Sequence, residues 1–304
     1  MVGCEKLKKM ELVFNGMIDE PFISFCCRDN IIKPQMALLN DAESTIIDLK
    51  KFIREYTERG FESHECMNCA QKKYIESTQD RIEFVNLSMY PSSCQCNCTY
   101  CDIVSNKKFM MFDKEKHYKK YIMLFDILKE LISEGLIDKD ALWQVSPGEI
   151  SVHPLKNEIL DMVYEKKCII YSNCFIYDDR IADILRCNKN SFLNFSIDAG
   201  CYEAWKKIKG HNNFYQVLDV LKRYVDVSNG YKINIKYILM PDHNDGNNDL
   251  DGLIKILSTL KIDKIILSHD YDEVITKKDI SIMRKFKDKL ERNGIYVDTT
   301  AFDY

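Results

Sequence analysis

The sequence contains no apolar run near the roughly 20 residues that a membrane-spanning helix needs. Its first residues, Met1 to Lys9, lack the apolar core of a secretory signal peptide. There is also little excess charge of either sign, because 43 basic residues oppose 47 acidic ones and leave a net charge of -4. We therefore expect a cytoplasmic protein without a membrane partner, and nothing in the charge pattern indicates nucleic-acid binding.

Low-complexity tracts are also missing, as are internal repeats other than an alternation of strands and helices. With 304 residues, of which 46% are hydrophobic, the chain can bury a large core. This composition predicts a globular protein with one large domain, or with a large and a small one.

Cysteine, by contrast, is abundant, with 13 residues in the chain. An odd number of thiols argues against a complete set of disulfides, so we expect most of them to be reduced. One group, comprising Cys26, Cys27, Cys66 and Cys69, lies in the first quarter of the chain, and a denser group lies between Cys94 and Cys101. The two groups suggest two metal sites.

From about residue 82 onward, segments typical of strands alternate with helical ones, which favours a parallel sheet or barrel of about six β/α units. The predicted strands are Ile82–Ser88, Ala141–Val145, Cys168–Asn173, Leu193–Asp198, Lys232–Met240 and Lys264–His269. The predicted helices are Lys114–Glu134, Asp179–Cys187, Phe214–Val225, Asp249–Leu260 and Lys277–Asn293. Because reactive groups of such folds gather at the carboxyl ends of the strands, we expect one functional rim there.

Residues 1–75 have a different pattern, with a strand-like stretch at Met10–Phe25, an Asn15-Gly16 turn signal and a helical segment at Glu43–Arg59. Alone, this part would have a small core, which a metal site would help to hold together. We therefore predict a small N-terminal metal-binding module in residues 1–75 and a core domain in residues 76–304.

The most informative stretch is Cys94-x3-Cys98-x2-Cys101. Three thiolates on a cubane of four irons leave one iron without a protein ligand, which is a site for binding and reducing a molecule. Cys96 leaves a second interpretation open, because Cys96, Cys98 and Cys101 could also be ligands of a structural zinc.

This motif, with Tyr100 before its last cysteine, resembles that of the radical S-adenosylmethionine (radical SAM) superfamily. The loop from Ser146 to Glu149 resembles the family's Gly-Gly-Glu loop, with Pro147 in place of the first glycine. Residues 194–200 and 205–210 resemble its fourth-strand region. The resemblance covers Glu83 to His269, and its downstream loops favour Cys94, Cys98 and Cys101 over the set that includes Cys96.

The resemblance implies a partial (β/α)6 TIM-like barrel, a [4Fe-4S] cluster on Cys94, Cys98 and Cys101, and SAM bound to the fourth iron. An electron from the reduced cluster then splits SAM into methionine and a 5′-deoxyadenosyl radical, which abstracts hydrogen from a substrate. It also implies an oxidoreductase-type reaction under anaerobic conditions and an electron donor such as flavodoxin or ferredoxin.

Several residues are candidates for binding SAM. Gly148 lets the backbone approach a ligand, and the Glu149 carboxylate could accept hydrogen bonds from an ammonium group. The resemblance places Ser196 and Asp198 near the ribose or carboxylate of SAM. The alternative for Glu149 is an ordinary loop carboxylate, and for Ser196 and Asp198 a hydrogen-bonded barrel interior.

Lys236 forms a polar pair with Asn234 on the fifth predicted strand, so it is a candidate contact of SAM or substrate, with the same barrel-interior alternative. By the resemblance, Tyr100 would hold the adenine end of SAM, partly through backbone groups.

The first cysteine group, Cys26, Cys27, Cys66 and Cys69, resembles the auxiliary-cluster segments called SPASM or twitch, although these usually follow the barrel. We expect at most one further iron-sulfur cluster there. Adjacent cysteines rarely bind one metal equally well, so which of Cys26 and Cys27 is a ligand stays open, as does zinc as the metal.

Cys174 and Cys201 follow the third and fourth predicted strands, where a thiol could return a hydrogen atom to a substrate radical. The alternative for each is a small buried hydrophobe. The SPASM-like segment suggests a peptide or protein substrate that is epimerised or cross-linked. A carbohydrate or other small molecule is the alternative substrate, and a zinc- or cluster-stabilised binding protein without turnover is the alternative class.

Overall fold

The computed structural model describes residues 2–4, 11–15, 22–24, 35–37, 42–59, 72–74, 81–89, 94–101, 114–146, 148–228, 230–270 and 275–299. The chain falls into two compact units. The first comprises residues 1–93, 108–148 and 161–168, and the second comprises residues 94–107, 149–160 and 169–304.

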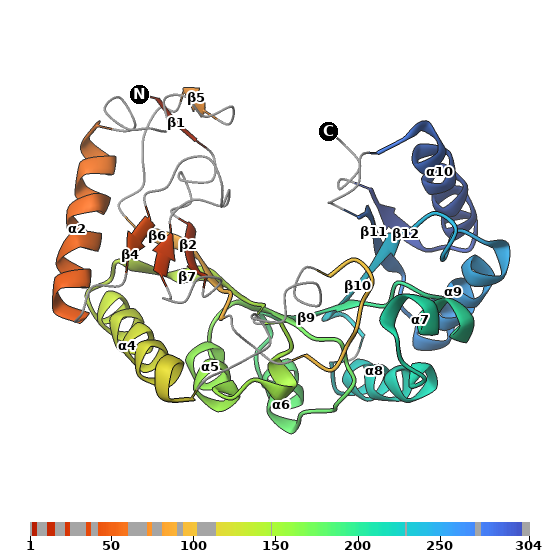
Figure 1. Ribbon diagram of the computed structural model, residues 1–304, viewed down its shortest axis with the longest axis horizontal. Coiled ribbons are helices and arrows are strands. Elements are labelled where there is room, and N and C mark those ends of the chain that lie inside the picture. Colours follow the sequence, from red (N-terminus) through yellow and green to blue (C-terminus); the bar gives the residue numbers. More distant parts are fainter. Residues whose placement is uncertain are drawn as a thin grey trace. The chain divides into compact units, whose positions relative to one another are not determined.

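In its described residues, the first unit combines strands of a mixed sheet, a separate two-stranded sheet of β1 and β5, and the helices α2 and α4 (Figure 1). Its strands are β1 (Val2–Cys4), β2 (Glu11–Asn15), β3 (Phe22–Ser24), β4 (Gln35–Ala37), β5 (Lys72–Tyr74), β6 (Ile82–Leu87) and β7 (Ile137–Val145), and its helices are α2 (Ala42–Arg59) and α4 (Lys114–Ser133). Strands β2, β6 and β7 are parallel, whereas β2–β3, β3–β4 and β1–β5 are antiparallel pairs.

The helix predicted from Lys114 is confirmed as α4, which packs beside α2. Tyr121, Phe125 and Leu128 are buried at helical spacing along its inner side. Gly135, with φ of 71°, adopts the left-handed conformation that ends such a helix.

The remaining elements lie wholly or mainly in the second unit. They are η3 (Ile150–Val152), α5 (Lys156–Val163), β8 (Cys168–Tyr171), α6 (Asp179–Cys187), β9 (Ser191–Ser196), α7 (Tyr202–Lys209), α8 (Phe214–Ser228), β10 (Ile233–Leu239), α9 (Asn247–Leu260), β11 (Lys264–His269), α10 (Lys277–Arg292) and β12 (Tyr296–Asp298). Strands β9 to β12 are parallel neighbours, and β8 lies beside β9. Helices α7 to α10 follow one face of these strands in Figure 1.

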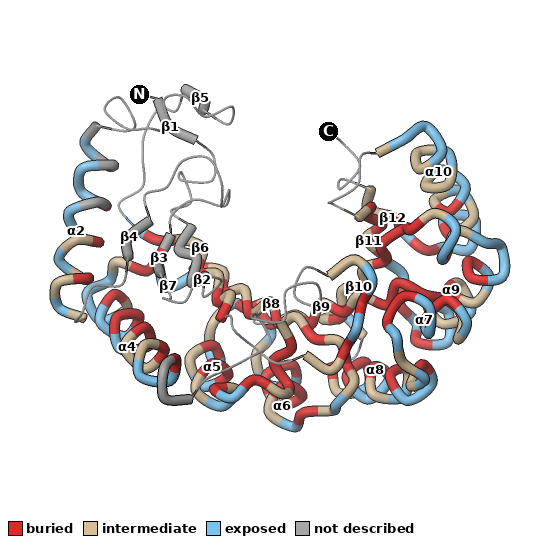
Figure 2. The backbone as a smooth tube through the Cα atoms, viewed as in Figure 1, coloured by how far each residue is buried: buried red, intermediate tan, exposed pale blue. Residues whose placement is uncertain are grey.

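The core of the second unit follows the strand alternation that the sequence predicts. Leu193, Phe195 and Ile197 are buried on one face of β9 and its extension, whereas Asn194 and Ser196 on the other face are half-buried. Figure 2 shows buried residues along these strands and exposed residues on the outer turns of the helices.

The predicted fold class is confirmed as parallel α/β. Seven strands, β6 to β12, have the parallel arrangement, and within the described part of the second unit β12 pairs with β11 alone, so this sheet is not closed. The short elements α5, α7 and β12 were not predicted. Strand β7 begins earlier than predicted, because the three consecutive charged residues 138–140 interrupt the apolar pattern of its first half.

The start of α9 fixes the loop that follows β9. Asp249 Oδ1 accepts hydrogen bonds from the backbone N–H groups of Gly200, at 2.8 Å, and Cys201, at 3.1 Å. A Cβ atom at Gly252 would lie 2.0 Å from the Gly200 carbonyl oxygen, so only glycine permits this approach. Asp198 is thereby held at the end of its strand.

Within the described ranges, no helix combines the length and apolar character needed to cross a membrane. Cys26, Cys27, Cys66 and Cys69 lie outside the described residues. The N-terminal module in residues 1–75 and its metal site therefore stay predictions.

Candidate functional site

Residues 94–101, which we call the cysteine loop, belong to the second unit and are fixed by backbone hydrogen bonds to the end of α7. The N–H of Asn97 donates to the carbonyl of Lys209 at 3.1 Å, and that of Thr99 donates to Ile208 at 3.0 Å. Gly210, with φ of 72°, ends α7 against Asn97, where a Cβ atom would lie 3.1 Å from the Asn97 Cβ. The local fold thus sets the path of the loop before any metal binds.

A buried ion pair joins the cysteine loop to β9. Lys209 Nζ donates to Asp198 Oδ2 and to the Tyr100 hydroxyl, each at 2.6 Å, and that hydroxyl donates to Asp198 Oδ2 at 2.6 Å. Asp198 is completely buried and Lys209 is 3% exposed. We call this group the Asp198–Lys209–Tyr100 triad.

Burial disfavours the charged form of Lys209, but the negative Asp198 and the neighbouring Tyr100 outweigh it, so the pKa of Lys209 is raised well above its usual value. The lysine therefore stays charged inside the protein. Asp198 itself has φ of 48°, and its Oδ1 accepts from the Ile238 N–H at 2.8 Å. Both carboxylate oxygens are thus engaged within the protein.

Glu149 forms a second buried carboxylate site. Its Oε1 accepts from the Ser151 N–H and the Ser172 hydroxyl, each at 2.9 Å, and its Oε2 accepts from the Asn173 N–H at 2.5 Å. Burial raises the pKa of Glu149, although these hydrogen bonds oppose the shift. Gly148 just before it has φ of 71°, a conformation that favours glycine.

Asn173 links Glu149 to the cysteine loop. While its backbone N–H binds Glu149, its side-chain Nδ2 lies 3.6 Å from Cys94 Sγ, 3.4 Å from Cys96 Sγ and 3.1 Å from Gln95 Oε1. The nitrogen of the same Gln95 side-chain amide, Nε2, is buried and has no hydrogen-bond partner among the described residues. An orphaned donor beside the thiols is consistent with a bound group that accepts hydrogen bonds.

The thiols of the cysteine loop differ in acidity. Hydrogen bonding with the Cys96 thiol lowers the pKa of Cys98 to about 6 and also lowers the pKa of Cys94. The pKa of Cys96 is raised instead, because its one S–H proton is shared between the sulfurs of Cys94 and Cys98. Thiolates are the metal-binding form of cysteine, so this pattern agrees with Cys94 and Cys98 as ligands and with Cys96 as a bystander.

The spacing of the thiols also bears on the choice between zinc and a cluster. Within the part of the chain that the structure describes, no three His, Cys, Asp or Glu side chains are arranged to hold a single metal ion. Zinc at about 2.3 Å from each sulfur would draw its ligands together. A cubane bonds each thiolate through a different iron, so its ligands need not converge on one atom.

The other predicted SAM contacts lie on the polar faces of β9 and β10. Ser196 is opposite Lys236 in the parallel register. This pair lies two residues further along the strands than the hydrogen-bonded pair of Asn194 and Asn234. Burial lowers the pKa of Lys236, although the charge of Asp198 opposes the shift. The side chains of Ser196 and Lys236 are both half-buried.

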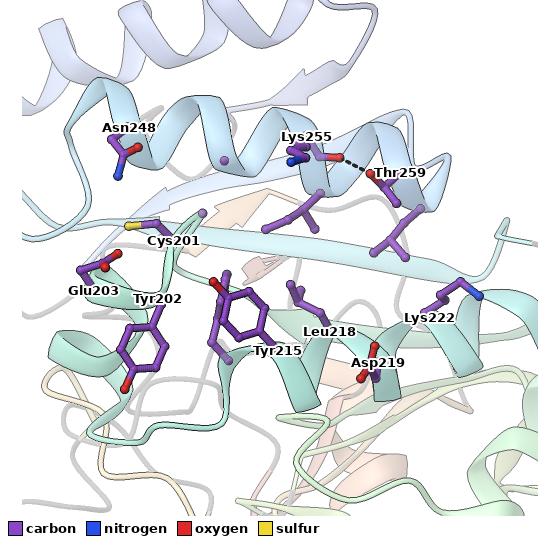
Figure 3. Close-up of a pocket in the computed structure, with 15 residues that line it drawn as sticks. Cys201, Tyr202, Glu203, Tyr215, Leu218, Asp219, Lys222, Asn248, Lys255 and Thr259 are labelled. Carbon is purple, nitrogen blue, oxygen red and sulfur yellow. Dashed lines mark hydrogen bonds between the residues drawn. The ribbon is translucent and has the colours of Figure 1, made fainter.

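The two candidate hydrogen-atom donors, Cys174 and Cys201, which we call the rim thiols, differ in exposure. Cys174 is completely buried, with φ of 56° and a pKa raised well above normal by burial. Cys201 is half-buried at the start of α7 and lines a pocket of about 490 Å³ between α8 and α9 (Figure 3). Tyr202 and Tyr215 flank the same pocket with stacked rings.

Two residues of the site, Asn173 and Lys209, are absent from the sequence prediction. Asn173 is the last residue of the third predicted strand, so the rule that reactive groups gather at the carboxyl ends of strands was sufficient to find it. Lys209 is one of three lysines in the last turn of α7, and no local pattern distinguishes the buried one from its exposed neighbours.

Comparison with known families identifies the class of protein. Residues 90–254, more than half of the chain, match the Radical SAM superfamily. The chain belongs to this superfamily of enzymes, for which a [4Fe-4S] cluster and SAM are the implied cofactors. The matched region contains the cysteine loop, Glu149, Asn173 and the triad.

Solved structures support the same fold. The chain resembles SuiB from Streptococcus suis with a TM-score of 0.53 and 14% identity, over 86% of this chain and 55% of SuiB. The SAM-bound form gives 0.54 and 15% over 86% and 56%, and the form bound to precursor peptide SuiA gives 0.53 and 14% over 100% and 75%. The chain thus spans about half the length of SuiB in the first two comparisons.

A curated relative matches a smaller part of this chain. The GTPase Obg of Brachyspira hyodysenteriae is 24% identical over 186 residues, which is 58% of this chain and 26% of that protein. The chain contains no Gly-Lys dipeptide, and therefore no phosphate-binding G-x4-G-K-[ST] loop.

We predict that Lys209→Met lowers the free energy of unfolding by about 3–5 kcal/mol, because it leaves the buried Asp198 carboxylate without its counter-charge. The double variant Asp198→Asn with Lys209→Met should recover part of this loss. Lys206→Met, an exposed change in the same helix, should stay within about 0.5 kcal/mol of the wild type. Urea unfolding of the metal-free protein measures all three, together with the single variant Asp198→Asn. A double variant as unstable as the sum of its single changes would rule out the ion pair.

Proposed function

We propose that the chain is a radical SAM enzyme that cleaves SAM reductively and abstracts hydrogen from a bound substrate. When bound, the cluster and SAM supply the 5′-deoxyadenosyl radical that carries out this abstraction. The main support is the position of Asn173, whose backbone N–H donates to the Glu149 carboxylate and whose side chain contacts Cys94 of the cysteine loop. A cluster site and an ammonium acceptor are thereby held in one unit.

In this proposal Cys94, Cys98 and Cys101 hold the cluster, and Glu149 accepts a hydrogen bond from the SAM ammonium group. An ionised carboxylate has about four acceptor positions. Three donors already use Glu149, two on Oε1 and one on Oε2, which leaves a position on Oε2. A carboxylate preorganised in this way binds an ammonium group at little reorganisation cost.

We further propose Ser196 and Lys236 as contacts of SAM or substrate, because they are half-buried polar residues opposite each other on β9 and β10. Asp198 has a different proposed role. Since its oxygens are taken by Ile238, Lys209 and Tyr100, it acts on the site by holding Tyr100 and the cysteine loop. Tyr100 then contributes to SAM binding through its backbone groups.

For the substrate, we propose a peptide or protein that is epimerised or cross-linked. The support is the fold likeness to SuiB, a structure of which contains precursor peptide SuiA. A small molecule such as a carbohydrate is the second candidate. A short open reading frame beside the gene would favour the peptide, and sugar-nucleotide genes would favour the carbohydrate. Flavodoxin or ferredoxin is the proposed electron donor.

Of the two rim thiols, Cys201 is the better candidate for a hydrogen-atom donor. It is accessible from the pocket between α8 and α9, whereas the Cys174 side chain has no exposed surface. A substrate radical must contact the thiol from which it takes hydrogen. Cys201→Ser should therefore block product formation while leaving SAM cleavage intact, and unchanged product would exclude this role.

We predict that the protein, reconstituted anaerobically with iron and sulfide, forms 5′-deoxyadenosine from SAM and dithionite. Cys98→Ala should abolish this product, because it removes a cluster ligand. Cys187→Ala, a change at an exposed cysteine of α6, should leave it unchanged. Liquid chromatography with mass spectrometry measures the nucleoside. Its absence from the wild type, or its persistence in Cys98→Ala, would refute the proposed reaction and favour a binding protein without turnover.

We also propose an auxiliary iron-sulfur cluster on Cys26, Cys27, Cys66 and Cys69. A variant in which Cys94, Cys98 and Cys101 are all alanine should then retain about four irons per chain after reconstitution. Replacing Cys66 and Cys69 as well should remove them. Elemental analysis that finds zinc, or neither metal, in the first variant would contradict the auxiliary cluster.

A further inference from the structure

The contacts around Asn173 point to a role that rests on the proposed cluster. The orientation of its side-chain amide is fixed, because Oδ1 accepts from the Phe175 N–H at 3.0 Å. Nδ2 is therefore turned toward the cysteine loop, where it lies within hydrogen-bond distance of the sulfurs of Cys94 and Cys96. A flipped amide would place an oxygen against these sulfurs and lose both contacts.

Gln95 continues the same network. Its Oε1 accepts from Asn173 Nδ2 at 3.1 Å, which fixes the direction of the Gln95 amide as well. Its Nε2 donor is then buried with no partner in the described residues. Burying an amide donor without a hydrogen bond is unfavourable, so we expect an acceptor to lie beside Gln95 Nε2 when the site is filled. The sulfur atoms of a bound cluster are acceptors of the required kind.

We propose that Asn173 and Gln95 are positioning residues that raise the reduction potential of the cluster by donating N–H hydrogen bonds to its sulfur atoms. Reduction adds one electron, here from dithionite, so the cluster and its thiolates become one unit more negative. Hydrogen bonds to sulfur stabilise that added charge and so favour the reduced state. The backbone N–H of Asn173 meanwhile holds Glu149, so one residue serves both cofactors through separate groups.

Asn173→Asp tests the first residue, because it keeps the shape while replacing the donor with a negative oxygen. An EPR-monitored redox titration without SAM should show a lower midpoint potential. A tenfold smaller equilibrium constant for reduction, the expected size of change, corresponds to 59 mV for one electron. Asn190→Asp, which adds the same charge at an exposed position, should titrate like the wild type.

Gln95→Met removes the second amide donor without changing the net charge or the length of the side chain. It should also lower the midpoint potential, but by less than Asn173→Asp does. Its iron content should match the wild type, so it keeps the proposal testable if Asn173→Asp fails to assemble. Gln95→Met with a wild-type potential would overturn the role of Gln95, and a cluster-loaded Asn173→Asp with a wild-type potential would overturn that of Asn173.

The signal to be titrated is the one that disappears when Cys94, Cys98 and Cys101 are replaced by alanine, which separates it from an auxiliary cluster. If no such signal exists, the proposed function itself fails. If the signal exists and both variants leave its potential unchanged, the radical SAM assignment stands and only the role of the two amides is refuted.

Discussion

The buried ion pair between Asp198 and Lys209 is the constraint on which the candidate site depends. It brings together the carboxyl end of β9, the end of α7 and Tyr100 of the cysteine loop. A buried pair with one partner removed is strongly destabilising, so none of the three segments can move away at low cost. The cysteines are consequently presented by a loop whose path is set by the protein.

Around this pair, backbone groups fix the geometry and side chains supply the chemistry. The ends of α7 and the loop after β9 are held by hydrogen bonds from Asn97, Thr99, Gly200 and Cys201, all of them main-chain donors. Glu149 and Asn173 complete the site from the loops that precede η3 and follow β8. Positioning of this kind suits a cofactor-dependent enzyme, in which the protein orients reactants around chemistry that the cofactors perform.

The sequence was sufficient to predict the parts of the site that depend on local patterns. The Cys94-x3-Cys98-x2-Cys101 spacing and a glutamate after glycine are short motifs, and the strand alternation around Leu193 has a period that the sequence shows. The triad depends on contacts between residues 98 and 109 positions apart in the chain, from Tyr100 to Asp198 and to Lys209. No local pattern encodes such contacts, so the sequence left Asp198 either as a SAM contact or as part of a hydrogen-bonded interior, without naming its partners.

Elements that escaped prediction share a physical cause. Helices α5 and α7 have eight residues each and strand β12 has three, so none is long enough to display a clear hydrophobic period. Their existence depends on packing against neighbours instead. The same applies to the N–H···S contacts of Asn173, which follow from where β8 ends relative to the cysteine loop.

The central claim is that the cysteine loop holds an iron-sulfur cluster with one iron open to SAM. EPR spectroscopy of the reduced, reconstituted protein before and after addition of SAM tests it most directly. We expect a cluster signal that requires Cys94, Cys98 and Cys101 and that changes when SAM binds. A protein that retains zinc and shows no such signal, or a signal that SAM leaves unaltered, would contradict it.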